Sequence, residues 1–139
     1  MMMGVASRIG ALVLVVASAL FGEAQSAHSQ SADLSFGDPY RLLQRDGEAI
    51  YRAICQGCHM PDGQGAIGAG AYPPLANDPN LEASGYPIVL VLEGRRAMPP
   101  FGRTLDDGQI AAVVNYVRTH FGNHHTDVAS AADVTSLRK

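Results

Sequence analysis

Hydrophobic residues recur at helical spacing in one segment near the C-terminus of the chain. Four apolar side chains stand at positions i, i+3, i+4 and i+7: Ile110, Val113, Val114 and Val117. Asp106 or Asp107 offers a cap at the start of this segment, and Gly122 follows its last periodic residues. The pattern therefore predicts a helix from residue 106 or 107 to about Phe121.

A weaker helical pattern lies between residues 38 and 55. Its apolar residues keep a rough helical spacing: Leu42, Leu43, Ile50, Tyr51 and Ile54. Asp38 can cap this helix, and Pro39 suits its first position. Gly47 interrupts the pattern, either as a break or as a point of close packing. We expect a helix from Asp38 to Cys55.

The segments between and after these patterns are less regular. Residues 56–83 are rich in Gly, Pro, Asn and Asp and predict a long loop, which is expected in a compact domain only where it has a function. Residues 87–93 are apolar. Their β-branched side chains favour a strand, but Pro87 and Gly94 favour a short helix, which we expect. Residues 123–139 are polar and predict a tail with a last helical turn at 131–137.

The first thirty residues have the character of a targeting segment. Arg8 precedes a mainly apolar run from Ile9 to Phe21, which is shorter than the roughly 20 residues of a membrane-spanning helix. Such a run, followed by small residues, is typical of a secretory signal. We therefore expect a signal peptide at residues 1–24, with an uncleaved membrane anchor as the alternative.

These patterns divide the chain into four parts and indicate its fold class. A signal peptide (residues 1–24) precedes a flexible, Ser-rich lead (residues 25–37), a domain (residues 38–122) and a C-terminal tail (residues 123–139). The domain contains helices separated by long loops. We therefore expect an all-α fold with three to five helices.

Composition narrows the class of protein. Hydrophobic residues make up 47% of the chain and charged residues 17%, which excludes a disordered protein. The net charge of −3 shows no basic excess, so we expect no nucleic acid partner. Two cysteines exclude a scaffold of several disulfides. Because Trp is absent and aromatic residues are only 6%, something other than aromatic side chains must fill the core.

The chemistry is concentrated in the run from Cys55 to His59, a Cys-x-x-Cys-His motif that is the attachment signature of haem c. Two thiols at this spacing can each bond one vinyl group of a porphyrin, and His59 then lies under the iron as a ligand. A thioredoxin-type redox pair would need a βαβ context, which the pattern does not predict. A zinc site of Cys55, Cys58 and His124 or His125 has suitable ligand types but leaves His59 unexplained.

Met98 is the candidate for the sixth position of the iron. It follows His59 by enough chain to reach the other haem face, and Pro99 and Pro100 would stiffen its loop. The alternatives are that Met98 only fills space, that a second histidine binds, or that the position stays open. His120, His124 and His125 fit a solvated surface better than a second ligand. Met60 is adjacent to His59 and cannot reach the opposite face.

With these residues the chain resembles a class I cytochrome c, monohaem and bacterial, from about Asp46 to Gly122. The resemblance implies the small cytochrome c fold, wrapped around one covalently bound haem. It matches Gly47 and Tyr51 to a glycine and an aromatic residue of the first helix, and Val113 and Tyr116 to the pair that packs against them. It also matches Pro73-Pro74-Leu75 to the Pro-x-Leu element, in which the carbonyl at Pro73 accepts a hydrogen bond from the proximal imidazole. Side chains expected to line the haem are Leu75, Ile88, Val91, Leu92, Phe101 and Val114.

The resemblance and the expected ligands imply a periplasmic one-electron carrier and not an enzyme. His59 and Met98 would close the iron coordination, which suits electron transfer. The alternative is a peroxidase-like or ligand-binding haem protein with an open sixth position. Residues 116–138 resemble the C-terminal stretch of cytochrome c subunits of periplasmic dehydrogenases, although Phe121 stands where those often have Trp.

That likeness points to a dehydrogenase as electron donor, with an oxidase or another cytochrome as acceptor. Contact with a membrane is expected only if the signal segment is retained. Arg95, Arg96 and Arg103 flank Met98 and would either pair with haem propionates or form a positive rim that steers docking.

Overall fold

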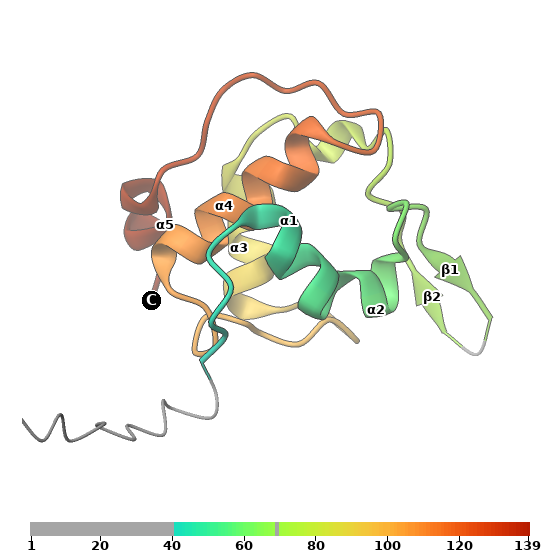
Figure 1. Ribbon diagram of the computed structural model, residues 1–139, viewed down its shortest axis with the longest axis horizontal. Coiled ribbons are helices and arrows are strands. Elements are labelled where there is room, and N and C mark those ends of the chain that lie inside the picture. The colour runs from blue at the N-terminus through green and yellow to red at the C-terminus, as the bar shows by residue number, and fades with distance from the viewer. Residues whose placement is uncertain (1–40, 69) are drawn as a thin grey trace, which may run out of the picture. The chain divides into compact units, whose positions relative to one another are not determined.

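The computed structural model describes residues 41–68 and 70–139 (Figure 1). The expected signal peptide and flexible lead lie outside these residues, as do Asp38 and Pro39. The helices and strands in chain order are α1 (Gly47–Ile50), the π-helical turn η1 (Tyr51–Cys55), α2 (Gln56–His59), β1 (Ala66–Ile67), β2 (Ala71–Tyr72), the 3₁₀ turn η2 (Pro79–Leu81), α3 (Gly85–Glu93), α4 (Asp107–Thr119) and α5 (Ala131–Leu137). The all-α prediction is confirmed, since the sheet in the described part of the chain is a two-stranded hairpin.

The first helical stretch begins later than predicted. Residues 41–46 are not helical, and α1 begins at Gly47 because the side chain of Asp46 accepts a hydrogen bond of 3.0 Å from the backbone N–H of Ala49. From Gly47 the elements α1, η1 and α2 follow one another without a gap as far as His59. The irregular loop therefore begins after His59 and not at residue 56, and it contains the β1–β2 hairpin and η2.

Gly47 is a point of close approach between helices and not a break. A Cβ atom at Gly47 would lie 2.3 Å from the carbonyl oxygen of Ala112 and 2.8 Å from the Cβ of Tyr116. Only glycine therefore allows α1 to lie so close to α4, as Figure 1 shows. One turn further on, the ring of Tyr51 packs 5.6 Å from that of Tyr116. This contact agrees with the packing that the resemblance implied between the first helix and the helix of Val113 and Tyr116.

A single cluster of buried apolar side chains joins the helices. It takes residues from α1, η1, α3, α4 and α5 and from the segments between them: Ile50, Tyr51, Leu81, Ile88, Leu92, Leu105, Ile110, Ala111, Val113, Val114, Val117, Ala129 and Val134. Burying such side chains stabilises the fold by about 25 cal/mol for each Å² of apolar surface removed from water. The four periodic residues of the predicted last helix all belong to this cluster, which confirms the face that the pattern predicted.

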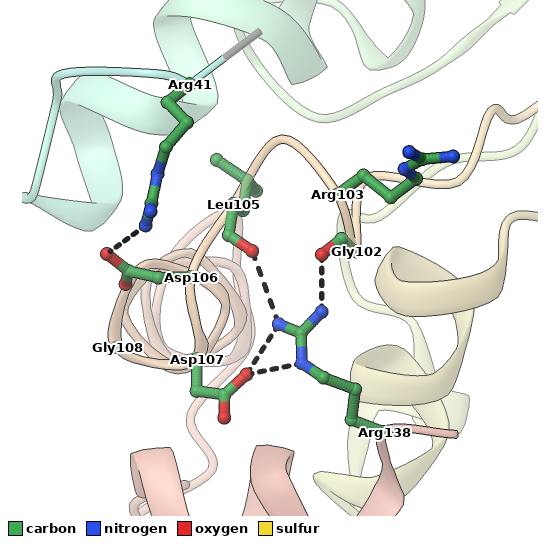
Figure 2. Close-up of a pocket in the computed structure, with 8 residues that line it drawn as sticks. All are labelled: Arg41, Gly102, Arg103, Leu105, Asp106, Asp107, Gly108 and Arg138. Atoms are coloured by element: carbon green, nitrogen blue, oxygen red, sulfur yellow. Dashed lines mark hydrogen bonds and ion pairs between the residues drawn. The ribbon is translucent and has the colours of Figure 1, made fainter. Parts of the chain in front are cut away.

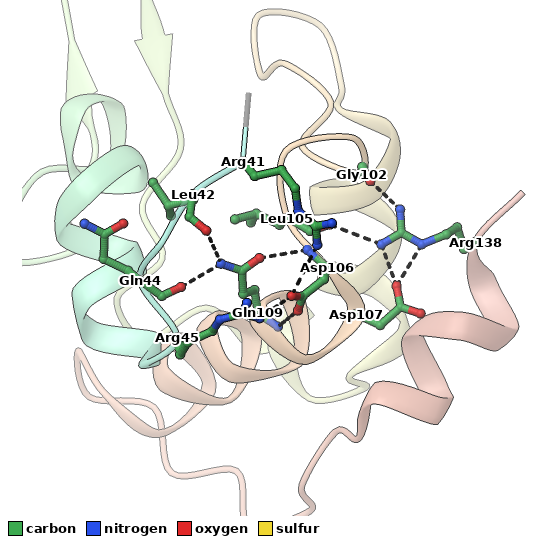
Figure 3. Close-up of polar contacts among 10 residues, drawn as sticks. All are labelled: Arg41, Leu42, Gln44, Arg45, Gly102, Leu105, Asp106, Asp107, Gln109 and Arg138. Atoms are coloured by element: carbon green, nitrogen blue, oxygen red, sulfur yellow. Dashed lines mark hydrogen bonds and ion pairs between the residues drawn. The ribbon is translucent and has the colours of Figure 1, made fainter. Parts of the chain in front are cut away.

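The start of α4 is a polar clamp between separate parts of the chain. Asp106 caps the helix, and its carboxylate and the side chain of Gln109 form a reciprocal capping box (Figure 3). The amide of Gln109 also donates to the carbonyls of Leu42, at 2.7 Å, and Gln44, at 2.6 Å. Arg45 pairs with Asp106 from the same entering segment. The irregular segment before α1, residues 42–45, is thereby bound to the start of α4.

A second set of contacts ties the C-terminus to the same place. Arg138 donates to the carboxylate of Asp107 at 2.5 and 2.7 Å and to the carbonyls of Gly102 and Leu105. These groups line an open pocket of about 550 Å³, in which Figure 2 shows Arg138 between the loop and the helix start. The charged side chains of the pocket, apart from Arg103, pair with one another. We therefore interpret this pocket as a place where ion pairs bind the two ends of the domain to the start of α4, and not as a ligand site.

The polar segment after Gly122 packs against the helices. α4 ends at Thr119, two residues before the predicted end, and Phe121 and Gly122 have positive φ angles of 58° and 82° that turn the chain back. Beyond the turn, α5 packs on α3 and α4, and Val134 is fully buried. The buried Arg118 of α4 donates to the carbonyl of Leu81 at 2.8 Å and pairs with Asp127. Residues 123–139, expected as a tail, thus contribute to the core of the described part.

Among the residues that the structure describes, no helix is both long enough and apolar enough to cross a membrane.

Candidate functional site

A cavity of about 520 Å³ collects most of the residues that the sequence singles out. Its walls come from the end of η1 and α2, the β1–β2 hairpin, α3 and the loop after α3. The predicted site residues on it are Cys55, Cys58, His59, Pro73 and Met98. The other lining residues are mainly apolar, with two arginines: Ile54, Ile67, Ala71, Tyr72, Pro74, Tyr86, Leu90, Arg95, Arg96, Ala97, Pro99 and Phe101.

The imidazole of His59 is fixed by a backbone carbonyl. Its Nδ1 lies 3.0 Å from the carbonyl oxygen of Pro73. A carbonyl oxygen can only accept a hydrogen bond, so Nδ1 carries the proton, and in the neutral ring this leaves Nε2 with a lone pair. An imidazole held in this way is oriented and made more basic as a metal ligand. This contact corresponds to the role that the resemblance implied for Pro73.

The two thiols stand on consecutive turns at the end of the first helical stretch. In η1 the backbone N–H of Gln56 donates to the carbonyl of Tyr51, five residues back. π-Helical turns are rare and are frequently found at functional sites. Burial, and secondarily the neighbouring Cys58, raises the pKa of the Cys55 thiol to about 12, so this group is neutral at physiological pH. Neither cysteine forms a disulfide, and Cys58 is exposed.

Met98 is presented by a tight turn after α3. The backbones of Arg95 and Met98 exchange hydrogen bonds of 2.9 and 3.0 Å, and Arg96 between them has a φ of 55°. Gly94 ends α3 with a φ of 72°, and a Cβ there would lie 2.5 Å from the carbonyl oxygen of Met98. Gly94 therefore permits the close approach of this turn, and the prolines that follow Met98 leave it little conformational freedom.

Several expected residues lie elsewhere. Leu75 does not line the cavity; it packs against the core cluster. Among the expected wall residues, Phe101 lines the cavity, whereas Ile88, Leu92 and Val114 belong to the core cluster and Val91 packs against it. Arg95 and Arg96 stand at the cavity, but Arg103 lines the pocket beside the start of α4.

An apolar rim, which the sequence pattern did not predict, borders the cavity. Three of its large side chains are unusually exposed: Ile67 at 95%, Tyr86 at 41% and Tyr72 at 36%. Two of them stand on the hairpin inside the Gly-rich segment, where no periodic pattern indicates that apolar residues share a face. The signal available in the sequence was the presence of Ile and Tyr in a loop that otherwise contains small and polar residues.

Of the histidines that the structure describes, those outside the motif do not join the thiols. His120 and His124 are exposed, and His120 stacks on Tyr116 with ring centroids 4.1 Å apart. In residues 41–68 and 70–139, no three His, Cys, Asp or Glu side chains come together as metal ligands. The structure therefore does not bring Cys55, Cys58 and His124 or His125 into a zinc site.

The residues around the cavity fit a haem. An imidazole with a free Nε2 and a thioether are two donors that haem iron accepts. The two thiols lie beside the imidazole, at the spacing that covalent attachment requires. The apolar lining suits a macrocycle, which would cover the exposed rim of Ile67, Tyr72 and Tyr86.

Comparison with known families agrees with this chemistry. Residues 43–117 match the family described as cytochrome c oxidase, cbb3-type, subunit III. The matched segment covers more than half of the chain and includes Cys55, Cys58, His59, Pro73 and Met98.

Individual relatives are of two kinds. The cytochrome c subunit of a quinone alcohol dehydrogenase from Gluconacetobacter polyoxogenes is 37% identical over 105 residues, which is 66% of this chain and 22% of that subunit. The cytochrome subunit of fructose dehydrogenase from Gluconobacter japonicus is 34% identical over 63% of this chain and 21% of its own length. Cytochrome c-552 of Thermus thermophilus is 37% identical over 58% of this chain and 71% of its own length. The chain thus spans about a fifth of the dehydrogenase subunits and most of the small cytochrome.

Proposed function

The chain belongs to this family of cytochrome c domains, and from that premise we propose that it is a periplasmic one-electron carrier with one haem c, attached through Cys55 and Cys58. His59 and Met98 would be its axial ligands. The observation that carries the proposal is the shared cavity, in which the fixed imidazole, the two thiols and the Met98 thioether stand together within an apolar lining. Electron transfer is the activity that the cytochrome relatives imply.

Each residue of the site would have a separate task. Haem c supplies an iron couple that takes up and releases one electron. Pro73 orients His59, so that Nε2 points at one face of the site. The Arg95–Met98 turn holds the Met98 sulfur with little freedom left to lose, and a thioether ligand raises the reduction potential. The apolar rim of Ile67, Tyr72 and Tyr86 would contact the macrocycle and limit its exposure to water.

The electron donor is proposed from the relatives. Their printed descriptions name alcohol, fructose and gluconate dehydrogenases. A periplasmic dehydrogenase is therefore the donor that we propose, with a terminal oxidase or another cytochrome as acceptor. With a single haem, the carrier would take the two electrons of a dehydrogenase reaction in two steps. Export would rest on the signal peptide expected at residues 1–24.

Absorption spectroscopy of the purified protein tests the axial ligation. The proposal predicts a low-spin haem c whose oxidised form shows the weak red-end band of a methionine–iron bond, and whose reduced form is unchanged by carbon monoxide. A high-spin spectrum that shifts on addition of carbon monoxide or peroxide would support the alternative of an open sixth position. Stopped-flow reduction by dehydrogenases of the same periplasm, each with its substrate, tests the donor. Fast reduction only by a quinol-oxidising membrane complex would contradict it.

A further inference from the structure

Asn123 is a buried polar residue outside the motifs of the site. It follows the turn at the end of α4 and is 3% exposed. Its side-chain amide donates to the carbonyls of Leu75, at 2.8 Å, and Val117, at 2.9 Å, and its oxygen accepts from the backbone N–H of Asp78 at 3.1 Å. Both amide protons and the oxygen are thus used. Breaking such buried hydrogen bonds leaves backbone groups unsatisfied.

Two of the three bonds go to the segment that carries Pro73. Pro73 and Pro74 have no backbone N–H, so neither can be anchored by a backbone hydrogen bond that it donates. The first anchors after them are at Leu75 and Ala76, whose N–H groups donate to the carbonyl of Gly63 at 2.7 and 3.0 Å. Asn123 binds the same segment at two further groups, the Leu75 carbonyl and the Asp78 N–H.

The turn after α4 makes further contacts with the segment that Asn123 binds. The N–H of Asn77 donates to the carbonyl of Phe121 at 3.1 Å, and a Cβ at Gly122 would lie 2.4 Å from the side-chain oxygen of Asn77. The segment from Leu75 to Asp78 is therefore held between the turn after His59 and the end of α4. We infer that these hydrogen bonds also position the carbonyl of Pro73, which lies two residues before Leu75.

We propose that Asn123 is a positioning residue that places the Pro73 carbonyl against the Nδ1–H of His59, and so sets the donor strength of the imidazole. This inference rests on the proposed function, since it concerns His59 as an iron ligand. A hydrogen bond from Nδ1 makes the imidazole a stronger donor, which stabilises the oxidised iron. Loosening the bond weakens that donation and raises the reduction potential.

The test compares holoprotein variants Asn123→Ala and Asn115→Ala. Asn115 is the matched control: it lies on α4 and bridges to Ala129 through two hydrogen bonds of 2.8 and 2.9 Å, none of which involves the Pro73 segment. Both variants lose hydrogen bonds that are at least partly buried, so both should lose stability. Only Asn123→Ala should shift the reduction equilibrium toward the reduced form, by about three- to tenfold, where tenfold corresponds to about 59 mV for one electron. Only Asn123→Ala should speed exchange of the His59 Nδ1 proton with solvent, followed by nitrogen-15 NMR, by tenfold or more.

An Asn123→Ser variant covers the case in which Asn123→Ala does not fold. It keeps one hydroxyl donor and should show a smaller shift in the same direction. Asn123 variants that lose stability but keep the wild-type potential and proton exchange would overturn the inference and leave the proposed function standing. A wild-type protein without haem, or without an iron-bound His59, would overturn both.

Discussion

The two methionines in the described part of the chain differ in what their surroundings allow. Met98 lines the cavity from a turn closed by two backbone hydrogen bonds. Met60 directly follows His59, with a φ of 63°, and its carbonyl accepts the hydroxyl of Tyr51 at 2.7 Å. Its side chain does not line the cavity. The proposal therefore assigns the thioether ligand to Met98 alone.

Met98→Leu should remove the proposed thioether ligand of the iron and keep a side chain of similar volume. We expect the reduction potential to fall by about 0.1 V, within the span of about 0.8 V over which axial ligands tune haem iron. The reduced protein should also bind carbon monoxide. Met60→Leu is the matched control and should leave the potential and the spectrum at wild-type values. Equal behaviour of the two variants in a redox titration would show that Met98 is not the ligand.

The residues of the site were predictable to different degrees. Cys55, Cys58 and His59 are contiguous because covalent attachment needs a fixed short spacing, so the sequence alone indicates them. Pro73 came from a resemblance, and its carbonyl does lie 3.0 Å from the imidazole. The rim and Asn123 were not predictable in this way, because their placement depends on loops brought together by the fold.

Among the elements, α1 and α4 approach each other closely where they cross at Gly47. This approach depends on the missing side chain of Gly47, which faces the backbone of Ala112. The contact fixes where α1, η1 and α2 run and hence where Cys55, Cys58 and His59 emerge. A change at Gly47 should therefore affect stability first and the haem site indirectly.

Gly47→Ala should destabilise the fold by about 1–3 kcal/mol, because the added methyl group overpacks a backbone contact. Gly108→Ala is the control: Gly108 stands in the first turn of α4, and its Cβ would be 3.5 Å from the nearest atom, the Asp106 carboxylate. That variant should be neutral or stabilising by up to about 1 kcal/mol. Urea unfolding of the holoproteins measures both. Similar unfolding midpoints for Gly47→Ala and the wild type would contradict the packing argument.

The sequence located the helices better than it located their ends. Periodicity found α4 and its buried face because packing imposes that spacing over several turns. The helix predicted over residues 41–46 was wrong because Asp46 is a competing cap beside the Gly47 crossing, and caps are decided by tertiary contacts as well as by residue type. The buried packing of residues 123–139 was missed because it relies on polar anchors such as Arg118, which periodicity does not register.

In the described part of the chain, four aspartates have a lowered pKa, and three of them, Asp106, Asp107 and Asp127, pair with arginines. These three link stability to pH. The pKa of Asp106 is lowered by the backbone N–H of Gln109 and then by Arg45. The pKa of Asp107 is lowered by the hydroxyl of Thr135 and by Arg138, and that of Asp127 by its hydrogen bond to Arg118. Because these folded-state values lie below the ordinary value of about 3.9, their stabilisation is present above that pH and is lost as the pH falls through the lowered values.

The holoprotein should therefore keep its stability from about pH 7 to pH 5 and lose it progressively below about pH 4. Urea midpoints measured across this range check the prediction. Asp107→Asn removes one of the three carboxylates and should make the acid loss less steep. An unfolding midpoint that stays constant down to pH 2 would contradict this linkage.

Docking to a partner protein depends on where charged side chains lie on the molecule as a whole. Arg95 and Arg96 stand at the cavity, and Arg95 donates to the hydroxyl of Tyr86 at 3.2 Å. Neutralising both, as Arg95→Gln with Arg96→Gln, should weaken the salt dependence of the electron-transfer rate, because a positive rim steers an acidic partner. Arg52→Gln with Arg103→Gln makes the same change in net charge away from the cavity and serves as control. An equal dependence of the rate on salt for the two double variants would exclude a role for Arg95 and Arg96 in docking.

The central claim is that one haem is bound covalently at Cys55 and Cys58. Mass spectrometry of the denatured protein, purified from cells that attach haem c, tests it most directly. The account predicts a polypeptide shortened by its signal peptide and heavier by the mass of one haem, and an unmodified mass for Cys55→Ala with Cys58→Ala. A wild-type polypeptide without added mass, or haem that extracts into acidified solvent, would contradict it.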